Sequence, residues 1–161
     1  MGFVLTEMGK PGRESFKLLF NHLQESDDAA TLGYVLKEVV PDKGSVNRGI
    51  FQVEEGYVTD LRETFNIQKA TLKENGLRED ELCSMNIFAF HPKDLDLFEG
   101  ILNKFKEENR GDRTAECLLP VETAELLNND SMKMKIYPTP EKWIGVTNPG
   151  DEELVKEFLK Q

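Results

Sequence analysis

The residue with the clearest chemical potential is Asn86, which lies inside the apolar stretch 83–90. Ile87, Phe88, Ala89 and Phe90 follow it, so both faces of their strand are expected to be buried, as in the middle of a covered sheet. A buried amide must find hydrogen-bond partners in the backbone, in water or in a ligand. Asn86 is therefore either a structurally bonded side chain or a ligand contact at the sheet.

The rest of the sequence offers no complete catalytic set of a common kind. No glycine-rich phosphate loop with GxGxxG or P-loop spacing occurs, and residues 9–12 fit a plain turn better than a phosphate-binding one. The 2 histidines, His22 and His91, make a zinc cluster improbable and define no Ser/His/Asp triad. Adjacent carboxylates stand in polar surroundings, where we expect solvated charge.

Composition indicates a soluble globular protein. The chain has 161 residues, of which 39% are hydrophobic and 31% charged, and its formal net charge is −10. Phosphate backbones repel such a surface, so nucleic acid is an unexpected partner. No apolar run is long enough to span a bilayer and no signal peptide precedes the first acidic residue, so we expect a cytoplasmic protein with no membrane partner. Cys83 and Cys117 are expected to be buried free thiols.

Hydrophobic periodicity predicts the elements that would position Asn86. Amphipathic spacing predicts helices over about 13–25, 92–106 and 120–127, with a last helix after Asn148. Strands are expected over 3–5, 31–40, 83–90, 132–136 and 143–147, with a hairpin over 49–63 and a surface excursion over 64–81. This order predicts one α/β domain over 1–161, with a mixed, mainly parallel sheet flanked by helices. Ligands in such sheets usually lie beyond the carboxyl ends of the strands.

Five short segments at or near the ends of these elements share a pattern with a known family. They are SVNRG (45–49), LRET (61–64), SMNIFAF (84–90), AECLLP (115–120) and KWIGVT (142–147). In that order they resemble segments of the sugar-1-phosphate nucleotidyltransferases, in particular bacterial nucleotidyltransferase-like proteins related to glucose-1-phosphate uridylyl- and thymidylyltransferases. The similarity covers roughly residues 12–161 and implies a partial nucleotide-diphospho-sugar transferase fold.

The resemblance also implies roles for five residues. By position, Gly49 would approach a sugar with its backbone, Glu63 would accept hydrogen bonds from sugar hydroxyls, and Asn86 would contact the sugar. Trp143 and Thr147 would flank the phosphate and metal region. Three of them also have a plainer interpretation: Gly49 as a turn or bulge, Glu63 as a solvated hairpin end, and Trp143 as a core aromatic.

The sequence departs from the family at the positions that carry its chemistry. The family's glycine-rich triphosphate loop has no counterpart, and its paired metal aspartates align with residues 7–10, where Met8 and Gly9 cannot bind Mg²⁺. A second metal aspartate of the family falls at Gly145. Mg²⁺ is thus the expected cofactor, but its ligands are not found, and no catalytic residue is assigned.

Three functions stay open at this point. The chain could be an incomplete transferase domain that is inactive alone and binds a sugar phosphate or nucleotide sugar. It could be a half-enzyme completed by a separate N-terminal half. It could also be a non-enzymatic interaction module that forms a homodimer through an exposed sheet edge.

Overall fold

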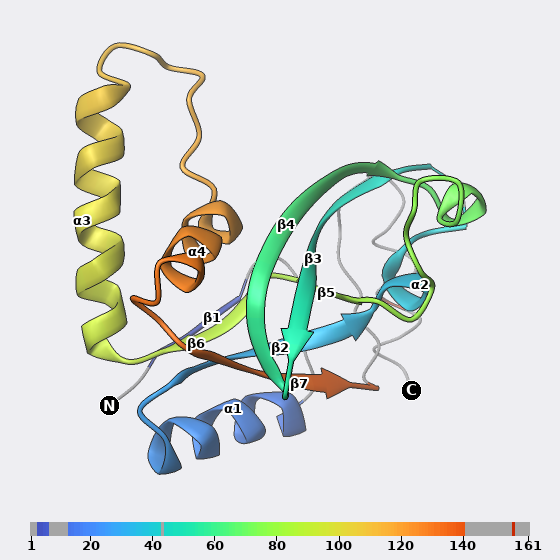
Figure 1. Cartoon of the computed structure of the whole chain (residues 1–161), viewed down its shortest axis with the longest axis horizontal. Coiled ribbons are helices and arrows are strands. Elements are labelled where there is room, and N and C mark those ends of the chain that lie inside the picture. The colour runs from blue at the N-terminus through green and yellow to red at the C-terminus, as the bar shows by residue number, and fades with distance from the viewer. Residues whose placement is uncertain (1–2, 7–12, 43, 141–155, 157–161) are drawn as a thin grey trace.

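The structure is a computed structural model that describes residues 3–6, 13–42, 44–140 and 156 (Figure 1). Its strands are β1 (Phe3–Thr6), β2 (Ala29–Val35), β3 (Val46–Glu54), β4 (Tyr57–Ile67), β5 (Leu82–Cys83), β6 (Ile87–Phe90) and β7 (Met134–Thr139). Its helices are α1 (Arg13–Glu25), α2 (Leu36–Val39), α3 (Pro92–Glu108) and α4 (Leu119–Asn128), with a 3₁₀ turn over Lys69–Thr71. The predicted last strand lies outside the described residues, and of the predicted last helix only residue 156 is described, as helical.

All strands belong to one mixed sheet of order β1-β6-β2-β5-β3-β4-β7, and β2 also pairs with β7. The β2–β7 pair is parallel, whereas the other described pairs are antiparallel. The mixed α/β fold with flanking helices is therefore confirmed, but the expectation of a mainly parallel sheet is wrong. Consecutive strands β3 and β4 are joined by a tight hairpin turn, which makes them antiparallel, whereas parallel strands require a long crossover.

Two apolar cores lie on opposite faces of the sheet. Alternation along β6 sends Ile87 and Ala89 into one core and Phe88 and Phe90 into the other, and all four residues are buried. Helix α1 covers the first face, while α3 and α4 lie on the second (Figure 1). The prediction that this strand is covered on both sides is confirmed.

The apolar run after β2 does not continue as a strand. The chain turns into the short helix α2, whose Leu36 and Val39 are both buried at helical spacing. The backbone N–H of Leu36 donates to the carbonyl of Glu81 at 2.8 Å, which holds the turn against the segment before β5. An apolar run alone does not distinguish a strand from a buried helical turn, so the prediction of a strand over 31–40 was wrong at its carboxyl end.

Residues 64–81 are not a simple surface excursion. β4 continues to Ile67, and Ile67, Leu72 and Leu77 are buried in the first core. The predicted helices over 13–25, 92–106 and 120–127 are confirmed as α1, α3 and α4, and the hairpin is confirmed as β3–β4. No helix of the described residues is long and apolar enough to cross a membrane.

Candidate functional site

Gly49 and Glu63 come together because they are partners across the β3–β4 hairpin. The Gly49 carbonyl accepts a hydrogen bond of 2.7 Å from the backbone N–H of Ser84, which ties β3 to the end of β5. A Cβ at Gly49 would lie 2.7 Å from Leu61 Cδ1 and 3.5 Å from Ser84 Cβ. Gly49 thus has a packing reason to be glycine, besides the role implied by the resemblance.

Asn86 lies in a sharp turn between β5 and β6, where its φ is +54°. Asn is one of the few residues that adopt this left-handed conformation readily. Its backbone N–H donates to Ser84 Oγ at 3.0 Å, and the Ser84 hydroxyl lies 3.4 Å from Asn86 Oδ1, to which it donates. The predicted strand over 83–90 is therefore broken at Ser84–Asn86, and this break leaves Asn86 partly exposed beside the Gly49 segment.

These contacts define a carboxyl-end site, made of Gly49, Glu63, Ser84 and Asn86. Tyr34, near the end of β2, pairs with Cys83 on one side and with Thr139, the last residue of parallel β7, on the other. The site therefore adjoins the carboxyl ends of the two parallel strands, which is where ligands of α/β sheets bind. Trp143 and Thr147, the other two predicted residues, lie outside the described residues.

Arg48 is a neighbour of this site that the sequence interpretation passed over. Its side chain is half-buried, and its guanidinium donates to the carbonyls of Asn47 at 2.8 Å and Val39 at 3.3 Å. Burial lowers the pKa of Arg48, while Cys83 and Glu63 act in the opposite direction. The available signal was that Val46 and Ile50, two positions before and after Arg48, are apolar. In a strand, a guanidinium that shares their face is partly buried and requires several acceptors.

Cys83, which directly precedes Ser84 of the site, lies in the first core. Its thiol is fully buried, and burial raises its pKa to about 12, against the opposing effect of the Arg48 charge. A thiol with so high a pKa stays protonated at neutral pH, so Cys83 is no nucleophile. The expectation of buried free thiols is confirmed for Cys83, whereas Cys117, also free, is only half-buried.

The carboxyl-end site suits hydroxyl groups better than it suits a metal. A carboxylate such as that of Glu63 accepts hydrogen bonds, and an amide such as that of Asn86 both donates and accepts. Among the residues that the structure describes, no group of three or more His, Cys, Asp or Glu could hold a metal ion. The described residues therefore provide no ligand set for the Mg²⁺ that the resemblance implies.

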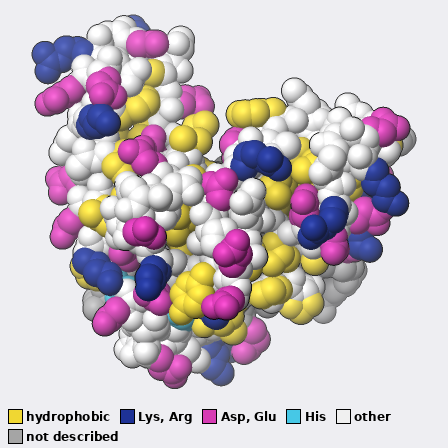
Figure 2. All heavy atoms as spheres, viewed as in Figure 1, with side chains coloured by type: hydrophobic (Ala, Val, Ile, Leu, Met, Phe, Trp, Pro, Cys, Tyr) yellow, Lys and Arg dark blue, Asp and Glu magenta, His cyan; other side chains and the backbone are white. Residues whose placement is uncertain are grey.

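The molecular surface carries both signs of charge. On the face seen in Figure 2, Lys and Arg are interspersed with Asp and Glu rather than gathered into one basic patch. The same view shows the face hollowed between the lobe at upper left, which contains α3, and the lobe at right. That nucleic acid is not a partner stays a prediction.

The fold is similar to that of a solved synthetase. A solved structure of CMP:2-keto-3-deoxy-manno-octonic acid synthetase, complexed with CTP, matches over 92% of this chain with 15% sequence identity and a TM-score of 0.52. This chain spans only 56% of that protein. At this identity the likeness shows the fold, and it confirms a sheet of the nucleotide-diphospho-sugar transferase type.

A second solved structure is less similar to this chain. Mannose-1-phosphate geranyltransferase from Thermus thermophilus matches over 88% of this chain, and over 45% of its own length, with 15% identity and a TM-score of 0.47. No protein-family model and no curated protein matches the sequence.

Proposed function

We propose that this chain is the sugar-side portion of a sugar-1-phosphate nucleotidyltransferase-like fold, and that it binds a sugar phosphate or nucleotide sugar at its carboxyl-end site. The convergence of Gly49, Glu63 and Asn86 carries the proposal. Gly49 and Glu63 are partners in the β3–β4 hairpin, and the Ser84–Gly49 hydrogen bond brings the more distant Asn86 segment beside them. The likeness to the synthetase supports the fold that the proposal assumes.

In this proposal each residue has a distinct task. Glu63 accepts hydrogen bonds from sugar hydroxyls, and the Asn86 amide contributes a donor and an acceptor whose direction is fixed by the turn. Ser84 is a positioning residue, because it binds both the backbone and the side chain of Asn86. By the resemblance, Trp143 and Thr147 would flank the phosphate.

We further propose that the chain does not catalyse nucleotidyl transfer alone. The transfer needs charge stabilisation at the phosphates, and neither a triphosphate loop nor a Mg²⁺ ligand set stands among the described residues. In the family's reaction a sugar 1-phosphate attacks the α-phosphate of a nucleoside triphosphate and releases pyrophosphate. A separate N-terminal half that carries the glycine-rich loop would supply the missing groups.

Thermal denaturation with and without millimolar glucose 1-phosphate tests the sugar site, since a ligand that binds only the folded protein raises the midpoint. We expect a higher midpoint for the wild type and no shift for Glu63→Gln. Asn86→Gly, which keeps the left-handed turn but removes the amide, should shift less than the wild type. Glu54→Gln, an exposed change at the far end of the same hairpin, is the matched control and should keep the full shift.

Parallel samples with UTP or dTTP and Mg²⁺ separate the two halves of the proposal. A shift of the midpoint with nucleotide and Mg²⁺ would contradict the proposal that the chain lacks a triphosphate site. The absence of a shift with any of these ligands would contradict sugar binding and favour the interaction module. That alternative uses the edge of β1, whose described pairing is with β6, and predicts a homodimer in sedimentation equilibrium.

A further inference from the structure

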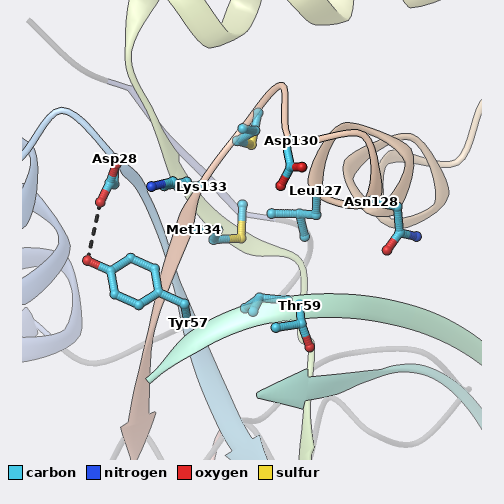
Figure 3. Close-up of a pocket in the computed structure, with 10 residues that line it drawn as sticks. Asp28, Tyr57, Thr59, Leu127, Asn128, Asp130, Lys133 and Met134 are labelled. Atoms are coloured by element: carbon cyan, nitrogen blue, oxygen red, sulfur yellow. Dashed lines mark hydrogen bonds between the residues drawn. The ribbon is translucent and has the colours of Figure 1, made fainter. Parts of the chain in front are cut away.

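An open hollow lies at the other end of the sheet, far from the carboxyl-end site. This amino-end cavity, of about 490 Å³, is formed where β2, β4 and β7 begin and where α4 ends (Figure 3). Its lining residues are Asp28, Tyr57, Val58, Thr59, Leu127, Asn128, Asp130, Met132, Lys133 and Met134. Tyr57 precedes Glu63 by six positions of β4, about 20 Å of strand, so the cavity and the carboxyl-end site are separate.

The floor of the cavity is apolar and adaptable. Val58, Leu127, Met132 and Met134 are all buried, and their side chains belong to the second core. Methionine side chains adjust to irregular ligand shapes because they are unbranched and polarisable. The floor would therefore accept a compact hydrocarbon body rather than require one particular outline.

The walls favour positive charge. Figure 3 shows the Asp28 carboxylate with the Tyr57 hydroxyl on one side of the floor and the Asp130 carboxylate on the other. Asp28 is held in place because Tyr57 donates to its carboxylate at 3.2 Å, the Ser26 hydroxyl accepts from its N–H, and His22 Nε2 lies 3.0 Å from its carbonyl. The carboxyl end of α4, with its negative partial charge and no basic residue in its last turn, opens on the same cavity.

Lys133 is the one lining residue of opposite charge. It is exposed, and among the described residues it forms no salt bridge with Asp28 or Asp130. Two carboxylates and a helix carboxyl end thus face the exposed ammonium of Lys133, and the ammonium of Lys135 lies 4.4 Å from the centroid of the Tyr57 ring. The carboxyl end of α4 and the formal net charge of −10 therefore tip the balance towards attraction of an incoming cation.

We propose that the amino-end cavity binds a small organic ammonium ion with a compact apolar body. The ammonium lies between Asp28 and Asp130, and the apolar body rests on Val58, Leu127 and Met132. This site is independent of the sugar site, so either proposal can fail without the other.

Methionine-methyl NMR tests the proposal locally, because Met132 and Met134 form the floor while Met85 lies in the other core. Three probes of similar shape are titrated near pH 7: cyclohexylammonium, neutral cyclohexanol and anionic cyclohexanecarboxylate. We expect cyclohexylammonium to shift the Met132 and Met134 signals saturably, with no shift at Met85. Its affinity should exceed that of cyclohexanol about tenfold.

Charge variants identify the groups responsible. Asp28→Asn and Asp130→Asn should each weaken cyclohexylammonium binding about three- to tenfold and leave cyclohexanol unchanged. Asn suits position 130, where φ is +58°, so this variant should fold. Asp112→Asn, a change in the exposed α3–α4 connection, is the control.

Three results would overturn the proposal. Equal binding of cyclohexanol would show an apolar cavity without charge recognition. Tighter binding of cyclohexanecarboxylate would show that Lys133 governs the site. The absence of a saturable shift at Met132 and Met134 would show that the cavity takes no ligand of this class.

Discussion

The carboxyl-end site and the amino-end cavity differ in what fixes their polar groups. At the carboxyl-end site the backbone does this work: Ser84 N–H binds the Gly49 carbonyl, and Asn86 N–H binds the Ser84 hydroxyl. At the cavity, side chains of exposed and half-buried residues stand around a methionine floor. The first arrangement suits a ligand recognised by fixed hydrogen-bond directions, and the second suits one recognised by charge and apolar area.

The two regions also differ in how much their residues contribute to the stability of the fold. Gly49, Ser84 and Cys83 are buried, so changes there alter packing as well as recognition. Asp130 and Asn128 are exposed, so changes there should alter recognition with little effect on folding, provided that the backbone conformation is kept. Variants of both regions test this contrast, and the largest effect is expected at Gly49.

A methyl group at Gly49 should destabilise the protein. Its Cβ would meet Leu61 Cδ1 at 2.7 Å, and Leu61 is itself held in the core, so Gly49→Ala should lower the free energy of unfolding by about 1–3 kcal/mol. Urea denaturation measures the change. Gly100→Ala is the matched control, since no heavy atom lies within 4 Å of that Cβ in the middle of α3, and it should raise stability by about 0.5–1 kcal/mol. A neutral Gly49→Ala would mean that the carboxyl-end site is as adaptable as the cavity.

The buried thiol beneath the carboxyl-end site should make stability fall in alkali. Burial raises the pKa of Cys83 in the folded protein to about 12 from an ordinary value of 9.0, so the unfolded chain loses this proton first. The stabilisation is complete below about pH 9 and is lost as pH rises towards 12, at up to about 1.4 kcal/mol per pH unit.

Urea denaturation between about pH 8 and 10.5, the range in which the unfolded thiol ionises, compares the wild type with Cys83→Ala. We expect the slope of unfolding free energy against pH to be steeper for the wild type, whatever the baseline cost of the lost side-chain volume. Cys117→Ala, at a half-buried position, is the control and should keep most of the slope. Equal slopes for the wild type and Cys83→Ala would mean that water reaches the thiol.

Much of this contrast could not be derived from the sequence, for identifiable physical reasons. Helical periodicity located α1, α3 and α4, because an apolar stripe at 3.6-residue spacing is a strong local signal. The strand direction was predicted wrongly, because pairing is decided by distant segments such as Val46–Glu54 and Leu82–Cys83. The break at Ser84–Asn86 was not predicted, because one residue in the left-handed conformation does not change the hydrophobic pattern of an apolar run.

The sequence indicated the carboxyl-end site but gave no indication of the amino-end cavity. Gly49, Glu63 and Asn86 were singled out by short segments with a family pattern, and the structure places their segments together. The amino-end cavity had no such pattern. Its polar residues Asp28, Tyr57 and Asp130 come from a helix–strand connection, a hairpin end and a helix end, and only folding brings them to one hollow. Their individual positions look like solvated charge and turn residues.

The left-handed residues, one in each region, should respond differently to glycine. Asn86 and Asp130 have φ of +54° and +58°, so replacement of either by Ala should cost about 1–2 kcal/mol. Asp130→Gly should restore the wild-type melting temperature, because the Asp130 side chain stands on an exposed rim. Asn86→Gly should restore less, because it also loses the contact between Ser84 Oγ and Asn86 Oδ1. If both glycine variants recovered the same melting temperature, the Ser84–Asn86 contact would contribute no more to stability than the exposed Asp130 side chain.

The smallest expected effect is on the titration of Tyr57. The negative charge of Asp28, and then its hydrogen bond, raise the pKa of the Tyr57 phenol above 10.0. Asp28→Asn removes the charge, so the pKa of Tyr57 should fall towards its ordinary value. Phenolate absorbance measures this best in a Tyr137→Phe background, because Tyr34 is buried and Tyr57 is then the accessible tyrosine.

Asp27→Asn is the control for this titration, because Asp27 is exposed beside Asp28 while the phenol is bonded to Asp28 itself. An equal fall in both variants would mean that Tyr57 responds to the general negative charge of the connection after α1. A fall in Asp28→Asn alone would mean that the carboxylate is already aligned with the phenol before any ligand arrives. A wall aligned in this way loses little freedom when it receives an ammonium ion, which is the condition under which a single carboxylate near the surface contributes measurably to binding.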